Sequence, residues 1–504
     1  MSRTRRATWT FALSLGGTVS GVALALITTP ILLQHLGDER VGAYRAAAEW
    51  VGYLALLDFG IAGSLQVAFA RAIGTGNRIG LAGAVRAGVR AGFFLGLLSA
   101  VFGLGLALLA PQLLRDASAE LTAELRIGLL VALLGAVWGP LIAFRPLADA
   151  GQRGHIVQIG LTLQAWVTAG LLIGLAASGF GLPGQFFAVA AGGGVGSLLL
   201  ARDGLRRFPE ILSRSAPAVA LPTAFSGAMF AYNLLGRIGL HSDSIIVGMT
   251  LGPTSVVAFA LTQRLLLLAD SQVMALGSSS WAALAELHHQ GKTELFNRRL
   301  TQLTRLTGVL GFTMIVPLAA ATRPFVTLWV GDSRFGGDWL VASTAAYVWV
   351  HTITALWGWP LMTTGRVRLV LPIYIVGIPL NIAISITGAI HIGPVGPALG
   401  SAISMALIWL PWLPLLLRRE FQTPLRPLIR AVAGPAMVGI PSAAAVYGFA
   451  IYVPLHELSI SVWARWVILL AFIGFGSVAY LVLAWITILP AGDQAELRGR
   501  LLGR

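Results

Sequence analysis

The sequence is dominated by long apolar runs, each of about 18 to 28 residues, that alternate with short polar segments. A helix rises about 1.5 Å per residue, so roughly 20 apolar residues cross the hydrocarbon core of a bilayer. A closed outer-membrane barrel would need strands of roughly ten residues in which apolar and polar side chains alternate, and these runs lack that alternation. The pattern predicts an all-α polytopic membrane protein.

The composition supports this class, because 56% hydrophobic and 11% charged residues leave too little polar surface to coat a soluble fold of 504 residues. The N-terminus begins with basic residues like a signal peptide, but its apolar segment continues to about Leu33 without a convincing cleavage site, so we expect a first span there. We predict about 14 spans, at residues 9–33, 43–70, 91–110, 125–144, 156–178, 184–201, 223–250, 255–285, 306–322, 341–361, 370–390, 397–417, 431–453 and 462–489.

Positive charge indicates the orientation of the chain. Of the 35 lysines and arginines, 26 fall in alternate loops or at their edges, so this side is expected to face the cytoplasm with both termini on it. The net charge of +15 therefore reflects topology in the cytoplasmic (inner) membrane, and we expect no nucleic-acid partner.

The spans form two halves followed by an addition. We expect an N-lobe at residues 1–201, a proline-containing cytoplasmic linker at 202–222, a C-lobe at 223–417, and two further spans with a cytoplasmic tail at 418–504. Each lobe contains six spans.

An internal repeat links the two halves. When the stretch Pro30–Arg71 is aligned without gaps with the residues that lie 215 positions later, Leu36 and Gly37 align with Leu251 and Gly252. Both copies end an apolar helix, turn at a Leu-Gly pair and return with charged residues. Duplicated halves that each open with a charged helical hairpin are typical of transporters whose site lies between the repeats.

Ionisable residues inside the spans are the first functional candidates, because charge at membrane depth is costly unless it faces a cavity or a partner. Arg45 and Glu49 are four residues apart on one helix face, so they either neutralise each other or present permanent positive charge to a central cavity. In the repeat, Arg264 aligns with Glu49. Glu49 is also a candidate for ion coupling.

Two aspartates, Asp58 and Asp270, each lie about sixteen residues into their helices. A desolvated carboxylate is suited to coupling with a proton or a sodium ion, whereas capping or pairing with a basic loop residue is the alternative.

The seventh predicted span adds Arg237 near its middle, together with Asn233, His241 and Asp243. Arg237 either lines the cavity or pairs with a buried acid, and Asp243 is a further ion-coupling candidate. His241 and Asp243 point to different faces, which disfavours a metal site. Asn233 and, in the next span, Gln263 are candidates for binding sugar hydroxyls.

Several kinds of chemistry are disfavoured. The chain has no cysteine, and its eight histidines form no HExxH motif, so we expect neither a metal nor a cofactor. Membrane glycosyltransferases and polysaccharide ligases need a sizeable catalytic loop, and the loops here are too short to fold alone. We therefore expect no enzymatic activity.

Three segments carry a family resemblance: PILLQHLGDERVGAYRAAAEWVGYLALLDFGIAGSL, HSDSIIVGMTLGPTSVVAFALTQRL and LWVGDSRF. Together they resemble the polysaccharide transporter (Wzx-type) flippases of the multidrug/oligosaccharidyl-lipid/polysaccharide (MOP) exporter superfamily. The likeness covers most of the chain through about residue 417.

The resemblance implies two six-helix lobes in a MATE-like V shape and transfer of a polyprenyl-pyrophosphate-linked oligosaccharide by ion-coupled alternating access. Implied partners are the lipid-linked glycan, membrane lipid, protons or sodium ions, a glycan polymerase and glycosyltransferases. Related fourteen-helix members include lipid II flippases, which are one alternative. A multidrug cation antiporter is another, although it would favour an acidic cavity over deep arginines.

Overall fold

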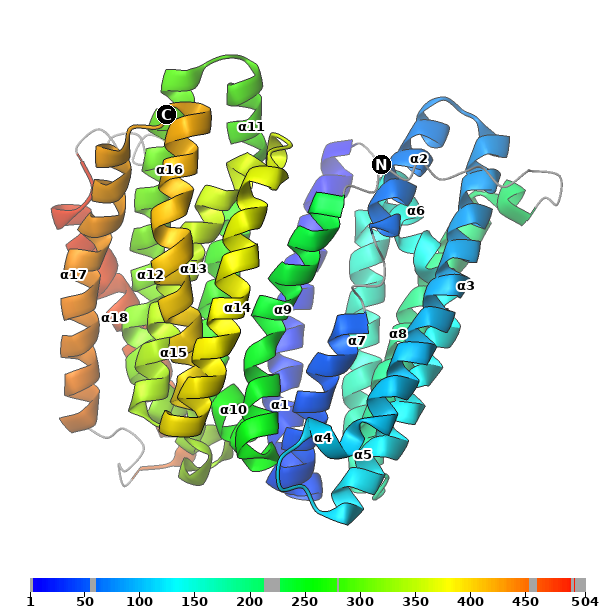
Figure 1. Cartoon of the computed structure of the whole chain (residues 1–504), viewed down its shortest axis with the longest axis horizontal. Helices are drawn as coiled ribbons and strands as arrows, with labels where there is room; N and C mark the ends of the chain where they lie inside the picture. The colour runs from blue at the N-terminus through cyan, green and yellow to red at the C-terminus, as the bar shows by residue number, and fades with distance from the viewer. Residues whose placement is uncertain are drawn as a thin grey trace. The chain divides into compact units, whose positions relative to one another are not determined.

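The computed structural model describes residues 3–54, 60–212, 227–278, 281–452, 460–490 and 494. These residues are almost entirely helical, and they divide into two compact units (Figure 1). Unit 1 comprises residues 1–237 and 252–256, and unit 2 comprises residues 238–251 and 257–504. The predicted lobes, linker and C-terminal addition stay predictions, and residues 213–226 of the linker region lie outside the described part.

Unit 1 begins with a long, kinked helix. Its elements are α1 (Arg3–Gly52), α2 (Ile61–Gly74), α3 (Arg78–Leu108), α4 (Ala110–Leu113), α5 (Ala119–Ala132), the 3-10 segment η2 (Leu133–Ala143), α6 (Phe144–Ala150), α7 (Gly154–Ala177), α8 (Gly181–Arg207) and the 3-10 turn η3 (Pro209–Leu212). Helix α9 (Gly227–Leu251) begins in unit 1 and ends in unit 2.

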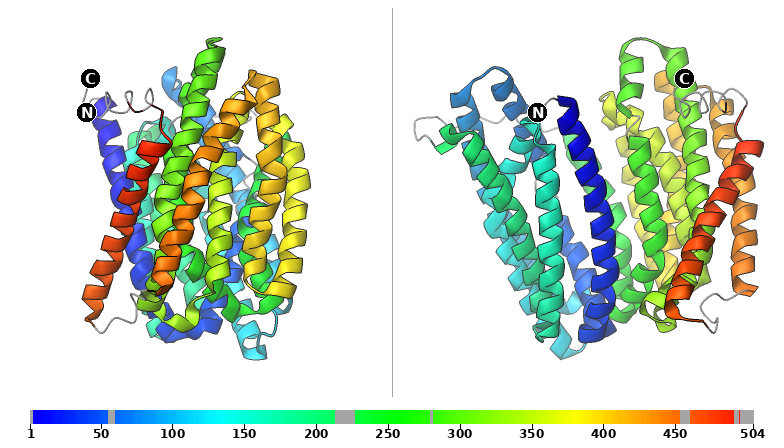
Figure 2. Two further views of the ribbon diagram at one scale, coloured as in Figure 1. Left: turned by 90° about the vertical axis from the view of Figure 1, so that its left-hand side faces the viewer. Right: turned by 180° about the vertical axis from the view of Figure 1, so that it is seen from behind.

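Unit 2 is built around the longest regular helix, α12. Its elements are α10 (Pro253–Ser278), whose first turn belongs to unit 1, α11 (Trp281–His289), α12 (Thr293–Val330), the 3-10 turn η4 (Asp332–Arg334), α13 (Asp338–Thr363), α14 (Val367–Ile392), α15 (Val395–Ser404), the π-helical turn η5 (Met405–Trp409), α16 (Leu410–Phe421), α17 (Leu425–Tyr452) and α18 (Val462–Thr487). Helices α17 and α18, orange and red in Figure 2, pack against α12.

The turn glycines of the proposed repeat share an unusual backbone. Gly37 breaks α1 with φ 76° and ψ 168°, and Gly252 joins α9 to α10 with φ 85°. Side chains other than hydrogen rarely tolerate positive φ, and the region occupied by Gly37 is essentially restricted to glycine. The two Leu-Gly pairs that the sequence aligns therefore both mark a change of direction in the chain.

Twelve helical segments in the described part of the chain are long and apolar enough to cross a membrane. The prediction of about 14 spans is not confirmed: α1 counts once although it covers one predicted span and part of the next, and α9 is not among the twelve. Helix α9 contains Arg237, His241 and Asp243, which lower its hydropathy. Several helices also extend past the predicted limits; α12 has 38 residues where the sequence predicts a span only at 306–322.

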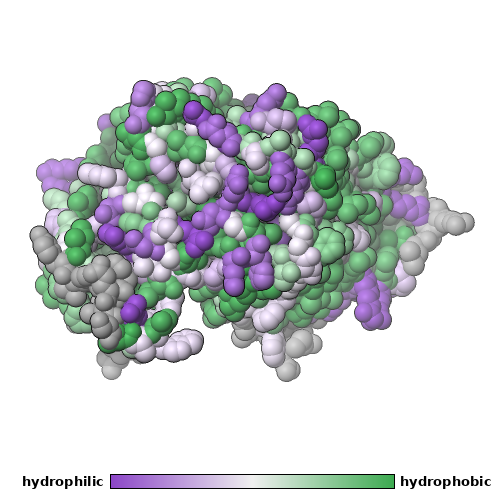
Figure 3. Space-filling model, turned by 90° about the horizontal axis from the view of Figure 1, so that it is seen from below, coloured by the Kyte–Doolittle hydropathy of each residue, from purple (hydrophilic) through white to green (hydrophobic). Residues whose placement is uncertain are grey.

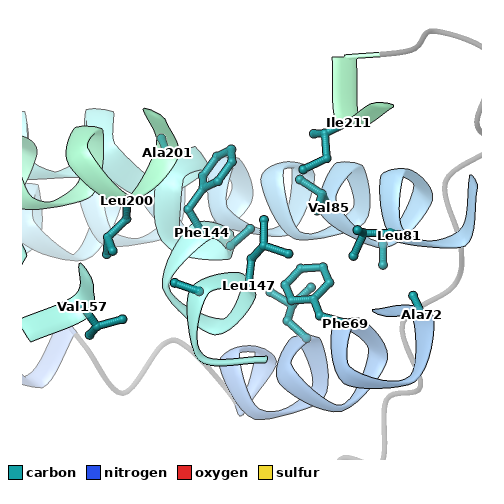
Figure 4. Packing of buried hydrophobic residues seen from close by; sticks show 14 residues of the cluster. Phe69, Ala72, Leu81, Val85, Phe144, Leu147, Val157, Leu200, Ala201 and Ile211 are labelled. Atoms are coloured by element: carbon teal, nitrogen blue, oxygen red, sulfur yellow. The ribbon is translucent and has the colours of Figure 1, made fainter. Parts of the chain in front are cut away.

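Packing inside each unit relies on apolar side chains and on small residues. Figure 4 shows the cluster of unit 1, in which Phe69, Phe144 and Leu147 meet from α2 and α6. Helix α3 approaches η2 closely, since a methyl group on Gly96 would lie 2.6 Å from the carbonyl oxygen of Ala136. Small residues permit this approach of two backbones, which is the usual way to pack helices in lipid.

The exterior is suited to a bilayer. Large apolar side chains are exposed along α3, α17 and α18, for example Phe94, Met437 and Phe475. Figure 3 looks at the end that carries the α9–α10 turn, where hydrophilic residues gather on the face and hydrophobic residues occupy the flanks. This distribution is expected when the apolar flanks face lipid and the ends face water.

Candidate functional site

Unit 1 contributes the charged second part of α1. After the break at Gly37, the helix brings Arg45 and Glu49 to half-buried positions, and both side chains have interacting partners. The ring of Tyr44 packs edge-on against Phe186 of α8, with 5.3 Å between centroids, and fixes this part of α1 beside α8. Whether Arg45 and Glu49 serve as cavity and coupling groups stays a prediction.

The polar turn itself is held by a clamp that sequence reasoning missed. Arg40 donates from Nε to Oε2 of Glu124 at 2.7 Å, and its NH2 group lies 3.2 Å from Glu120 Oε1. Oε1 of Glu124 accepts the backbone N–H of Leu182 at 2.7 Å. One carboxylate thus joins the turn of α1, helix α5 and the first turn of α8, where the helix dipole favours negative charge.

The other predicted binding residues differ in environment. Arg237 and Asn233 are exposed on the part of α9 that belongs to unit 1, and Arg264 is exposed on α10 of unit 2. Gln263 is buried and donates from Nε2 to Thr344 Oγ1 at 3.1 Å, so its amide holds α10 to α13. Asp58 lies outside the described residues.

A polar cluster inside unit 2 surrounds Asp243. Ser401 Oγ lies 3.0 and 3.3 Å from the two carboxylate oxygens of Asp243, and Asn381 Nδ2 donates to Ser401 Oγ at 2.8 Å. Asn381 also approaches Ser404 Oγ at 3.3 Å. Among the described residues, the buried Oδ1 of Asn381 has no hydrogen-bond partner, which leaves one acceptor of this cluster unsatisfied.

The second predicted coupling residue in this unit, Asp270, pairs with a histidine. His351 Nδ1 lies 2.9 Å from Asp270 Oδ1, and both side chains are about 15% exposed. The ring of Tyr347 stacks on His351 at 5.4 Å between centroids with an angle of 11° between planes. Two aromatic side chains of α13 thus lie beside this acid or its partner.

His351 is a functional candidate that the sequence analysis did not single out. The sequence could have identified it, because an ionisable side chain within an apolar span is a functional candidate by default. The sequence could not have identified its partner, since 81 residues separate His351 from Asp270. The two pairs offer carboxylate, hydroxyl, amide and imidazole groups, which can bind and release a proton or a monovalent cation.

In the described part of the chain, no three histidine, cysteine or acidic side chains converge as they would around a metal ion. The geometry is that of charged and hydrogen-bonded groups within helices.

Comparison with models of protein families gives no match, and comparison with curated protein sequences gives none either. Solved structures do match. A structure of the lipid II flippase MurJ in an inward closed conformation aligns with a TM-score of 0.66 at 13% identity, covering 98% of this chain and 100% of that one.

Two conformations of a multidrug resistance MATE family transporter of the MOP superfamily also match. The inward-facing one has a TM-score of 0.62 at 15% identity and covers 79% of this chain and 96% of the other. The outward-facing one has a TM-score of 0.56 at 14% identity and covers 82% and 96%. Likenesses at this identity concern the fold. The chain is therefore a multi-pass helical membrane protein whose fold is similar to those of MurJ and the MATE transporters.

Proposed function

We propose that the protein is a flippase that moves a polyprenyl-pyrophosphate-linked oligosaccharide across the cytoplasmic membrane by alternating access. The observation that carries this proposal is the full-length likeness to a flippase of a lipid-linked precursor, which covers 98% of the chain. The MATE transporters cover 79% to 84%. Residues 418–504 follow the predicted twelve-span core and make up about a sixth of the sequence. This share is close to the part of the chain that the MATE matches leave uncovered.

The charge inside the spans supports an anionic cargo. Arg45, Arg237 and Arg264 carry permanent positive charge, because a guanidinium group does not lose its proton in a protein. A pyrophosphate group is recognised by such charges, whereas a cationic drug is repelled by them. We propose that these three arginines contact the pyrophosphate and its sugars, with membrane lipid around the polyprenyl chain and both termini in the cytoplasm. Glycosyltransferases and a polymerase would supply and consume this substrate.

Ion coupling is assigned to unit 2 in this proposal. The carboxylate of Asp243 contacts the hydroxyl of Ser401, which in turn contacts the amide of Asn381, and the carboxylate of Asp270 contacts the imidazole of His351. Each carboxylate can bind a proton or a sodium ion, and it can return to its hydrogen-bonding neighbour when that ion leaves. Occupancy of Asp243 would then bias the conformations of the transporter.

Lipid II is a second candidate cargo, favoured by the MurJ match over the whole chain. It shares the polyprenyl pyrophosphate and differs in the sugar-peptide group. The three segments that resemble polysaccharide transporters favour an oligosaccharide repeat unit instead.

The direct test is transport by purified protein in liposomes, with a fluorescent polyprenyl-pyrophosphate-linked oligosaccharide or lipid II as cargo. Arg237→Ala and Arg264→Ala should each lower the initial rate at least about tenfold, since one charge-assisted contact contributes roughly 1.5–3 kcal/mol. The control is Arg418→Ala, which removes an exposed charge at the end of α16. Full activity in both cavity variants, or equal loss in the control, would contradict the assignment.

The coupled ion is identified by running the same assay under a pH gradient or a sodium gradient. Asp243→Asn keeps the shape of the side chain and removes its charge, so transport should no longer respond to the gradient that drives the parent protein. If Asp243→Asn responds like the parent and Asp270→Asn does not, the coupling group is Asp270.

A further inference from the structure

A pocket at the start of α12 is not used by the proposed transport cycle. It has a volume of about 450 Å³ and lies within unit 2, where one face of α12 meets the segment between α16 and α17. Its lining residues from α12 follow helical spacing and therefore share one face, and they are Glu294, Asn297, Arg298, Thr301, Gln302 and Arg305.

The opposite wall is made of proline. Pro424 and Pro427 supply apolar rings and no backbone N–H donors. The pocket is thus cationic and hydroxylated on one side and apolar on the other. Such a pair of walls suits a ligand that carries an anion on an apolar frame better than a free ion.

The two walls are fixed to each other by hydrogen bonds. Asn297 donates from Nδ2 to the carbonyl oxygens of Phe421 and Gln422 at 3.2 and 3.3 Å, and its Oδ1 accepts the hydroxyl of Thr423 at 2.7 Å. These bonds hold the segment between α16 and α17 against α12.

The charge balance around the pocket is strongly positive. Residues 292–306 and 418–430 contain eight lysines and arginines and two glutamates. Arg426 and Arg430 are exposed on α17, outside the lining, and add to the positive potential. Glu294 is the one acidic residue in the lining.

The position along α12 indicates the depth of the pocket. The apolar part of this helix begins directly after Arg305, so Arg305 lies at the expected edge of the hydrocarbon core. Arg298 lies seven residues nearer the start, about 10 Å further out at 1.5 Å per residue. We therefore expect this interval to lie in the layer that lipid headgroups occupy.

We propose that this pocket binds the phosphodiester headgroup of an anionic glycerophospholipid, with Arg298 and Arg305 contacting the phosphate and the proline rings packing on the glycerol. The site lies at the end of unit 2 that the charge distribution predicts to be cytoplasmic, where anionic lipids favour basic segments. It is separate from the arginines assigned to the cargo.

The test is native mass spectrometry of the full-length protein in detergent, titrated with dioleoylphosphatidylglycerol or with zwitterionic dioleoylphosphatidylethanolamine. The parent should bind phosphatidylglycerol about tenfold more tightly. The double variant Arg298→Gln with Arg305→Gln should lose most of this preference. The matched control, Arg426→Gln with Arg430→Gln, removes the same amount of charge outside the pocket. It should weaken binding less than about threefold, because exposed charges that do not touch the lipid contribute little to its binding.

A second variant separates binding from folding. Thr301→Trp fills the pocket without changing its charge and should also abolish the preference. Parent-like binding in Thr301→Trp, or equal losses in the two arginine pairs, would overturn the site. Binding of inorganic phosphate with no preference between the lipids would overturn the lipid as occupant.

Discussion

The clamp around Glu124 allows a quantitative prediction about unit 1. Glu124→Ala removes the acceptor for Arg40 and for the backbone N–H of Leu182. Leu182 is completely buried, so its N–H is left without that acceptor at a cost of roughly 1–3 kcal/mol. The pair with Arg40 contributes less than a buried ion pair, because the Arg40 side chain is 39% exposed, and we assign it about 1 kcal/mol. The expected loss in the free energy of unfolding is about 2–4 kcal/mol.

The same helix provides the control. Glu120 lies one turn from Glu124 and pairs with the same arginine, but its side chain is 83% exposed and no hydrogen bond to α8 is seen among the described residues. Glu120→Ala should therefore cost between about 0 and 1 kcal/mol. Glu124→Gln keeps an oxygen for Leu182 and loses the charge, so its effect should lie between the two alanine variants.

Thermal unfolding in detergent measures these differences. For a unit of roughly 240 residues, 1 kcal/mol shifts the melting temperature by about 2–4 °C, so Glu124→Ala should lower it by roughly 5–15 °C and Glu120→Ala by less than about 4 °C. Equal shifts for the two alanine variants would refute the reasoning, because they would show that the attraction to Arg40 alone, and not the hydrogen bond to α8, sets the strength of the clamp.

Three other predictions concern stability. Gly396→Val should destabilise unit 2 by about 1–3 kcal/mol or more, since its side chain would collide with the backbone at Gly388; a melting temperature like that of the parent would contradict this contact. Gly37→Ala should cost about 1–3 kcal/mol because φ there is 76°, and chemical denaturation can measure it. Burial lowers the pKa of His288, and the positive charge of Arg366 and the neighbouring histidine lower it further. As the pH falls below about 6.5, this histidine therefore takes up a proton in the unfolded chain before it does so in the folded protein. The free energy of unfolding should decrease over this range until the pH falls below the lowered pKa of the folded protein. The variant His288→Gln should show a smaller fall in melting temperature between pH 7.5 and 5.5, and an unchanged fall would rule out this histidine as a source.

The sequence predicts the helical membrane fold because the apolar runs are local features that report directly on burial in lipid. It predicts candidate acids for the same reason, since charge at such depth is rare. It does not predict their partners: Asp243 meets Ser401 from 158 residues away, and the meeting depends on how α9 packs against α15. The buried amide of Gln263 has a similar origin, because a glutamine in a span can face a neighbouring helix as readily as a cavity.

The π-helical turn at Met405–Trp409 has a consequence for the register of its helix. Such a turn accommodates one residue more than the regular hydrogen-bond pattern needs, and each residue advances the direction of the side chains by about 100°. Ser401 and Ser404 lie before the turn, and α16 follows it. Deleting one residue from this stretch would leave the composition nearly unchanged, but it would rotate all of α16 relative to the two serines. A related chain could therefore lack one residue here only if the whole of α16 packed against its neighbours in a different way.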